Sequence, residues 1–128
     1  MKSLLAVFIG SGAGGVLRYL LSRFPGFEIQ EGKFPLSTFV VNVTACLLLG
    51  LITTLAQSRD WLTPHMRLLL TTGFCGGFST FSTLNQEGIE LFKSGHTSLM
   101  LGYMLLSIVI GMASGLFGMY LGQVWTKG

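Results

Sequence analysis

The sequence predicts an all-α membrane protein with four transmembrane helices. Half of its 128 residues are apolar, only 10% are charged, and the mean hydropathy is +0.66. Four apolar runs follow one another, and each approaches or exceeds the roughly 20 residues that cross a bilayer core once short flanks are included. A soluble domain of this length would expose more charge. The predicted spans are residues 3–22, 35–57, 66–92 and 97–125 of a single domain, residues 1–128.

The first span has an alternative interpretation as a secretory signal. Lys2 precedes a short apolar run that contains small residues, as in a signal peptide. However, the apolar character resumes from Val16 to Leu21, and the chain continues with further apolar runs. We therefore interpret this segment as a spanning helix. Cys46 and Cys75 fall inside later spans without a Cys-x-x-Cys motif, which indicates small core residues.

The distribution of basic residues gives no preferred orientation in the membrane. Four spans place the N-terminus, the second connection (residues 57–67) and the C-terminus on one side, and connections 23–35 and 93–97 on the other. Each side carries four cations, and the positive-inside rule, which compares these numbers, therefore favours neither orientation. Either the rule is weak in so short a chain, or the chain inserts both ways and pairs as an antiparallel dimer. The two sets are Lys2, Arg59, Arg67 and Lys127, and Arg18, Arg23, Lys33 and Lys93.

Small residues recur at helical spacing in the first and fourth spans. The first contains Gly10-x-x-x-Gly14. Such faces let helices approach closely in lipid, where no hydrophobic force drives association. The pattern leaves open whether the contacts lie within one subunit or between subunits. In the fourth span the residues are Gly111, Gly115, Gly118 and Gly122.

The third span carries polar groups over about half of its circumference. A helix with this pattern must face protein or water rather than lipid. One isolated hydroxyl would satisfy itself on the carbonyl one turn back, but four hydroxyls above Glu87 exceed what that explains. The two neighbouring stripes are Thr80, Thr83 and Glu87, and Ser79, Ser82 and Gln86.

A helix break is expected at the Gly76-Gly77 pair in the middle of this span. Non-helical backbone at such depth is tolerated only when it is buried in protein or lines a cavity. A break frees carbonyl oxygens, which suit a small cation, and creates a helix N-terminus, which favours an anion. The sequence therefore predicts ion chemistry without its sign. Asn42, Tyr103 and Ser107 in the neighbouring spans add further polar groups.

The string GFCGGFSTFST (residues 73–83), with Asn42 in the second span and Arg18 of GGVLRYLL ending the first, resembles the Fluc (CrcB) family of fluoride channels. The resemblance covers essentially the whole chain. It implies an antiparallel, dual-topology homodimer with two narrow fluoride pores in the inner membrane of a bacterium. It also implies a structural sodium ion at the dimer centre, held by backbone carbonyls of Gly76 and Ser79, and a structural role for Arg18.

By the same resemblance, the fluoride pore has seven residues. Aromatic ring edges carry partial positive charge, so a ring can face an anion without trapping it as a full cation would. The family usually repeats phenylalanine after the second Ser-Thr, whereas this chain has Leu84, so one of the two aromatic stations is missing or is supplied from elsewhere. The implied pore residues are Asn42, Phe81, Ser82, Thr83, Glu87, Tyr103 and Ser107.

Other classes of protein fit the sequence less well. A small dual-topology multidrug/proton antiporter shares the size and charge balance, but it needs an embedded carboxylate, typically in the first span, which has none. A subunit without transport activity would explain the glycine faces but not the hydroxyl-rich span. An enzyme is not expected, because no metal-ligand spacing or nucleophile–base pair lies within a span. We expect a passive channel that exports cytoplasmic fluoride and confers resistance.

Overall fold

The structure is a computed structural model that describes residues 1–28, 30–58, 60 and 62–128, and its regular elements within these residues are all helices. This confirms the predicted all-α class. Three helices are long and apolar enough to cross a membrane, so the chain is a multi-pass membrane protein. Arg59, one of the cations counted above, lies outside the described residues. The elements are α1 (Lys2–Ser22), α2 (Leu36–Ser58), α3 (Pro64–Leu68), the π-helix η1 (Leu69–Cys75), α4 (Gly76–Phe78), α5 (Phe81–Lys93) and α6 (Thr97–Lys127).

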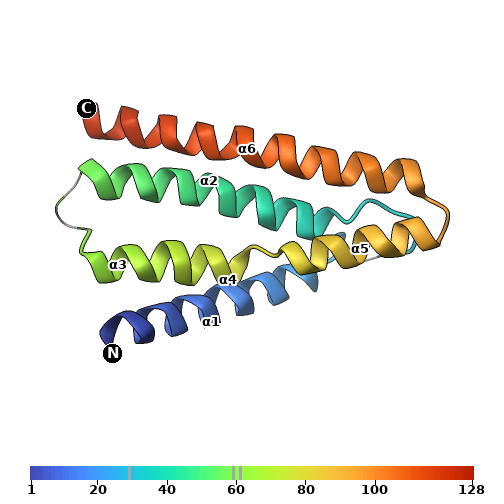
Figure 1. Ribbon diagram of the computed structural model, residues 1–128, viewed down its shortest axis with the longest axis horizontal. Coiled ribbons are helices and arrows are strands. Elements are labelled where there is room, and N and C mark those ends of the chain that lie inside the picture. The colour runs from blue at the N-terminus through green and yellow to red at the C-terminus, as the bar shows by residue number, and fades with distance from the viewer. Residues whose placement is uncertain (29, 59, 61) are drawn as a thin grey trace.

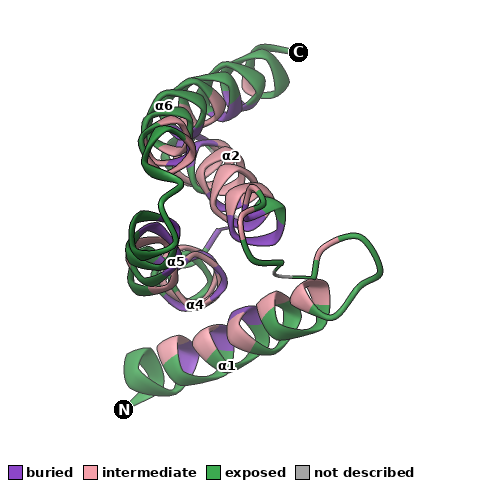
Figure 2. Cartoon of the chain, turned by 90° about the vertical axis from the view of Figure 1, so that its right-hand side faces the viewer, coloured by how far each residue is buried: buried purple, intermediate pink, exposed green. Residues whose placement is uncertain are grey.

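The long helices run lengthwise beside one another, and α3, η1, α4 and α5 follow one another in a broken column that corresponds to the predicted third span (Figure 1). Both termini lie at the end where α2 finishes and α3 begins. α2 packs mainly against α6, and α1 packs against η1 and α4, so α1 and α6 lie at opposite edges of the subunit (Figure 2). The small central cluster of Val41, Ala45 and Phe78 lies where α2 meets α4, and Leu21 packs against it.

The glycines of the first and fourth spans bring helices into backbone contact within one subunit. A methyl group added to Gly14 would lie 2.7 Å from the backbone nitrogen of Phe78 and would also clash with the Phe74 carbonyl. Gly118 packs in the same way against the backbone of Leu47 and Leu51 in α2. These contacts settle part of the question that the sequence left open, because they are intramolecular. Gly12, by contrast, faces open space in the subunit.

The third span breaks two residues later than expected. Gly76 has helical dihedral angles (φ −66°, ψ −38°), whereas Ser79 (φ −71°, ψ 157°) and Thr80 (φ −151°, ψ 119°) are extended. The expectation of a break at the glycine pair itself is therefore wrong. Gly77 serves helix packing instead, because a Cβ at this position would lie 2.7 Å from the Cα of Ser11 in α1. The broken helix is present, but Ser79 and Thr80 form the break.

Replacing Gly14 with alanine tests the packing of α1 against the third span. The new methyl group would have to displace backbone, so we expect the free energy of unfolding to fall by about 1–3 kcal/mol. Gly12→Ala is the matched control in the same helix, where the methyl group meets nothing within 4 Å. Thermal unfolding in detergent measures both variants. Equal stability of the two would contradict the close backbone contact.

Candidate functional site

The side chain of Asn42 in α2 holds the break of the third span open. Its Oδ1 accepts a hydrogen bond from the N–H of Thr80 (2.8 Å), and its Nδ2 donates one to the carbonyl of the same residue (3.0 Å). In a continuous helix the Thr80 N–H would bond the Gly76 carbonyl, four residues back. Because Asn42 takes this donor, the Gly76 carbonyl is released from the helical ladder. The amide thus replaces, for one residue, the partners that the helix would have supplied.

Thr80 then starts α5 as its N-cap residue. The Thr80 Oγ1 accepts the backbone N–H of Thr83 (3.2 Å) and donates its own hydrogen to the Thr83 Oγ1 (3.0 Å). A hydroxyl has one donor hydrogen and two acceptor lone pairs. Since the Thr83 oxygen accepts in this pair, its own hydrogen is left to donate elsewhere. The start of α5 therefore offers a hydroxyl donor beside the positive end of a helix.

Glu87 is the buried acidic group of the site, with only 4% of its surface exposed. Thr38 Oγ1 of α2 donates to one carboxylate oxygen (2.7 Å), and Tyr103 Oη of α6 donates to the other (2.6 Å). Ser107, one turn along α6, donates its hydroxyl to the Tyr103 carbonyl (2.7 Å). The carboxylate therefore links three helices through hydroxyl groups, as a buried charge in a membrane protein requires.

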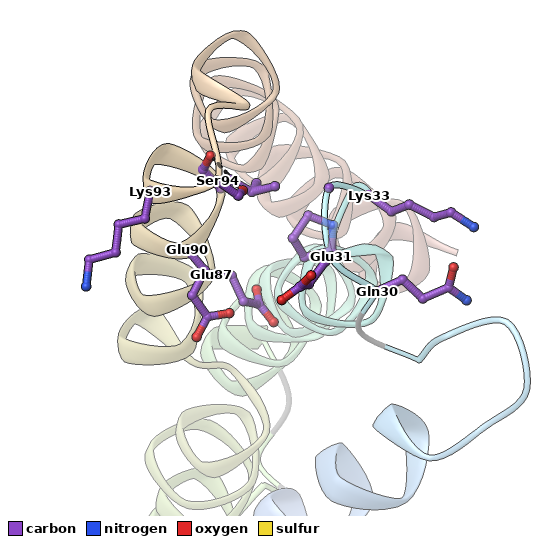
Figure 3. A pocket seen from close by; sticks show the side chains of 10 residues that line it. Gln30, Glu31, Lys33, Glu87, Glu90, Lys93 and Ser94 are labelled. Atoms are coloured by element: carbon purple, nitrogen blue, oxygen red, sulfur yellow. Dashed lines mark hydrogen bonds between the residues drawn. The ribbon is translucent and has the colours of Figure 1, made fainter.

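Two cavities meet at Glu87. The first has a volume of about 280 Å³ and is lined by Arg18, Thr38, Thr80 and Thr83, among others. The second, of about 400 Å³, lies between the α1–α2 connection and the end of α5. Figure 3 shows the second cavity, with the carboxylates of Glu87, Glu90 and Glu31 near its centre and the side chains of Lys33 and Lys93 extending away from it. Cavity space that contacts Glu87 thus extends from the break to the end of α5.

Arg18 contributes an unused donor to the first cavity. Its Nε is buried and has no hydrogen-bond partner among the residues that the structure describes. A buried N–H without a partner costs free energy, and a guanidinium group is a donor only. The Nε of Arg18 and the hydroxyl of Thr83 therefore supply hydrogen-bond donors for an anion in this cavity, which the Glu87 carboxylate also lines.

The structure brings together some of the predicted pore residues and separates others. Asn42, Thr83, Glu87 and Tyr103 gather around the break and the first cavity, and Ser107 joins them through the Tyr103 carbonyl. Phe81 is 77% exposed and Ser82 is also exposed, so both lie on the outside of the subunit.

Gly76 and Ser79 line a different hollow, of about 370 Å³, on the other side of the break. Consecutive residues therefore line separate cavities, with Ser79 in this hollow and Thr80 in the cavity of Arg18. The sequence interpretation missed Thr38, which bonds Glu87. The signal was available, because Thr38 lies four residues before Asn42 and therefore on the same face of α2.

These features define a small, all-helical membrane protein with a polar, broken span at its centre. The sequence model of the family described as "CrcB-like protein, Camphor Resistance (CrcB)" matches residues 5–119. The chain is 42% identical over 123 residues to a protein of Phocaeicola vulgatus, covering 96% of this chain and all of that protein. It is also 42% identical over 125 residues to a protein of Chlorobaculum tepidum, covering 98% of each.

A third relative, from Bacteroides fragilis, is 39% identical over 125 residues, covering 96% of this chain and 98% of that protein. Each of the three relatives is named "Fluoride-specific ion channel FluC". The chain belongs to the CrcB family.

The variant Asn42→Asp tests the role of the amide at the break. It replaces the Nδ2 donor with an oxygen that faces the Thr80 carbonyl, so both loss of a hydrogen bond and repulsion follow. We expect the free energy of unfolding to fall by about 1–3 kcal/mol and ion flux through reconstituted protein to be lost. Asn85→Asp, at the other asparagine of the chain, is the control and should retain both. Near-normal flux in Asn42→Asp would contradict this role.

Proposed function

We propose that this protein is a passive, fluoride-selective channel that lets fluoride leave the cytoplasm of a bacterium across its inner membrane. The observation that carries the proposal is the cavity beside the break, where the buried Nε of Arg18 and the hydroxyl of Thr83 offer hydrogen atoms to an anion. The names of the three relatives support fluoride as that anion. The protein is then an ion channel and not an enzyme.

The site suits conduction because its donors are numerous and few of them are charged. A conducting site must bind an ion well enough to replace its hydration shell, yet weakly enough to release it. The hydroxyl of Thr83 meets this requirement, and Arg18 is the one cation among the described residues that line the cavity. The membrane potential, negative inside, supplies about 2.3 kcal/mol per elementary charge per 100 mV and drives an anion outward.

An antiparallel homodimer completes this proposal. Phe81 and Ser82 project from the subunit at the level of the break, where a second subunit would cover them. The predicted pore residues on the outside of one copy would then meet the polar cavities of the other. The balanced cations on the two sides of the membrane permit insertion in both orientations.

The same proposal places a structural sodium ion at the centre of the dimer. The residues fit, because Asn42 takes the donor that the Gly76 carbonyl would otherwise bond, and Ser79 is extended beside the same hollow. Carbonyl oxygens are hard ligands that suit a small cation. The Gly76 and Ser79 carbonyls of both copies would hold the ion and so tie the two subunits together.

Fluoride efflux from proteoliposomes tests the channel directly. With the membrane potential clamped and no proton gradient, we expect proteoliposomes that contain the protein to release fluoride and to retain chloride. Protein-free vesicles are the control. Efflux that requires a proton gradient would contradict a passive channel and would indicate an exchanger.

The variant Gly76→Val tests the dimer and its sodium site. Among the described residues of one subunit, a Cβ on Gly76 would meet only the Thr71 carbonyl, at the ordinary distance of 3.9 Å. We therefore expect a folded subunit that loses dimerisation, sodium-dependent stability and fluoride flux. Gly77→Val is the contrasting variant, because its side chain clashes with Ser11 inside the subunit and should reduce stability itself. A Gly76→Val protein that remains a fully active dimer would contradict the proposed site.

A further inference from the structure

A polar hollow lies where α1 ends, next to the cavity of Arg18, with which it shares Tyr19 and Ser22 as lining residues. It has a volume of about 460 Å³ and is lined by Tyr19, Ser22, Arg23 and Glu28. Because Ser22 is the last residue of a membrane-length helix, the hollow lies at the depth of the lipid headgroups. The chain leaves α1 at this point in a wide, exposed loop before it returns to α2 (Figure 2).

Hydrogen bonds of the last turn of α1 hold one wall of the hollow in place. The backbone N–H of Arg23 donates to the Leu20 carbonyl (3.1 Å), so Arg23 continues the last turn of α1. The Ser22 hydroxyl donates to the Tyr19 carbonyl (2.7 Å). These bonds fix the positions from which Tyr19 and Arg23 project. Glu28 faces them from the loop, beyond a turn at Gly26, whose φ is +89°.

The two charged residues of the hollow, Arg23 and Glu28, do not form an ion pair with each other. Within the described part of the chain, no oxygen–nitrogen pair of Arg23 and Glu28 comes as close as the 4.0 Å of an ion pair. Both side chains are exposed. A cation and an anion that flank one cavity without pairing are complementary to a ligand that carries both charges in the opposite order.

We propose that this hollow binds the headgroup of a phospholipid with a primary ammonium, such as phosphatidylethanolamine. The guanidinium of Arg23 holds the phosphate, which Arg recognises with parallel N–H donors. The carboxylate of Glu28 accepts hydrogen bonds from the ammonium. The ring of Tyr19 lies beside the glycerol region, because amphipathic aromatic rings favour the membrane interface.

This chemistry predicts an order among lipids. A quaternary ammonium has no N–H to donate, so phosphatidylcholine loses the hydrogen bonds to Glu28. Phosphatidylglycerol has no positive group, and its phosphate brings a net negative charge near the Glu28 carboxylate. The hollow should therefore retain phosphatidylethanolamine best and phosphatidylglycerol least.

Native mass spectrometry of the purified protein tests the inference, with the three lipids added singly and with identical acyl chains. Arg23→Gln should reduce retention of phosphatidylethanolamine roughly tenfold, because it removes a charge-assisted contact. Glu28→Gln should abolish the preference over phosphatidylglycerol. Glu31→Gln and Lys33→Gln are the matched controls, since these residues lie in the same loop but line the cavity of Figure 3 instead.

Lipid retention is measured without ion transport, so this experiment can fail while the proposed channel function holds, and the reverse. Retention that is equal for the three lipids in the unmodified protein would overturn the inference. If the two control variants lost as much retention of phosphatidylethanolamine as Arg23→Gln, the inference would also be overturned. Such a result would indicate that the loop attracts lipid through its charges in general.

Discussion

The pair of hydrogen bonds between Asn42 and Thr80 is the constraint on which the rest of the site depends. In a bilayer an unsatisfied backbone group costs several kcal/mol, so a break in a spanning helix must find partners nearby. A single amide supplies both a donor and an acceptor to one residue. Thr80 can then cap α5, and the Gly76 carbonyl is set free on the opposite side. One side chain thus produces a helix N-terminus and a released carbonyl within a few residues.

Close packing of small residues makes this arrangement possible. Gly14 and Gly77 allow α1 to touch the backbone of the third span, and Gly118 allows α6 to touch α2. Phe81 and Ser82, after the break, lie on the outside of the same chain. The chain therefore has a polar break beside a largely apolar exterior, as expected of a protein that is surrounded by lipid.

Much of the fold could be predicted from the sequence, because apolar runs and helix length depend on local composition. The all-α class and the membrane-length helices follow from such runs. The position of the break could not, because it depends on a contact between α2 and the third span. A glycine pair indicates flexibility, but Gly77 is needed for contact with Ser11, and the break occurs where Asn42 reaches the backbone. For Thr38 the sequence does show a position on the same face of α2 as Asn42, but only the fold shows that this face meets Glu87.

The reversal potential of the reconstituted protein shows whether fluoride moves through it passively. In a planar bilayer with different fluoride concentrations on the two sides, we expect a current that reverses at the equilibrium potential of fluoride. A chloride gradient or a pH difference should leave that potential unchanged. A reversal potential that moves with the proton gradient, or with chloride, would contradict a fluoride-selective passive channel.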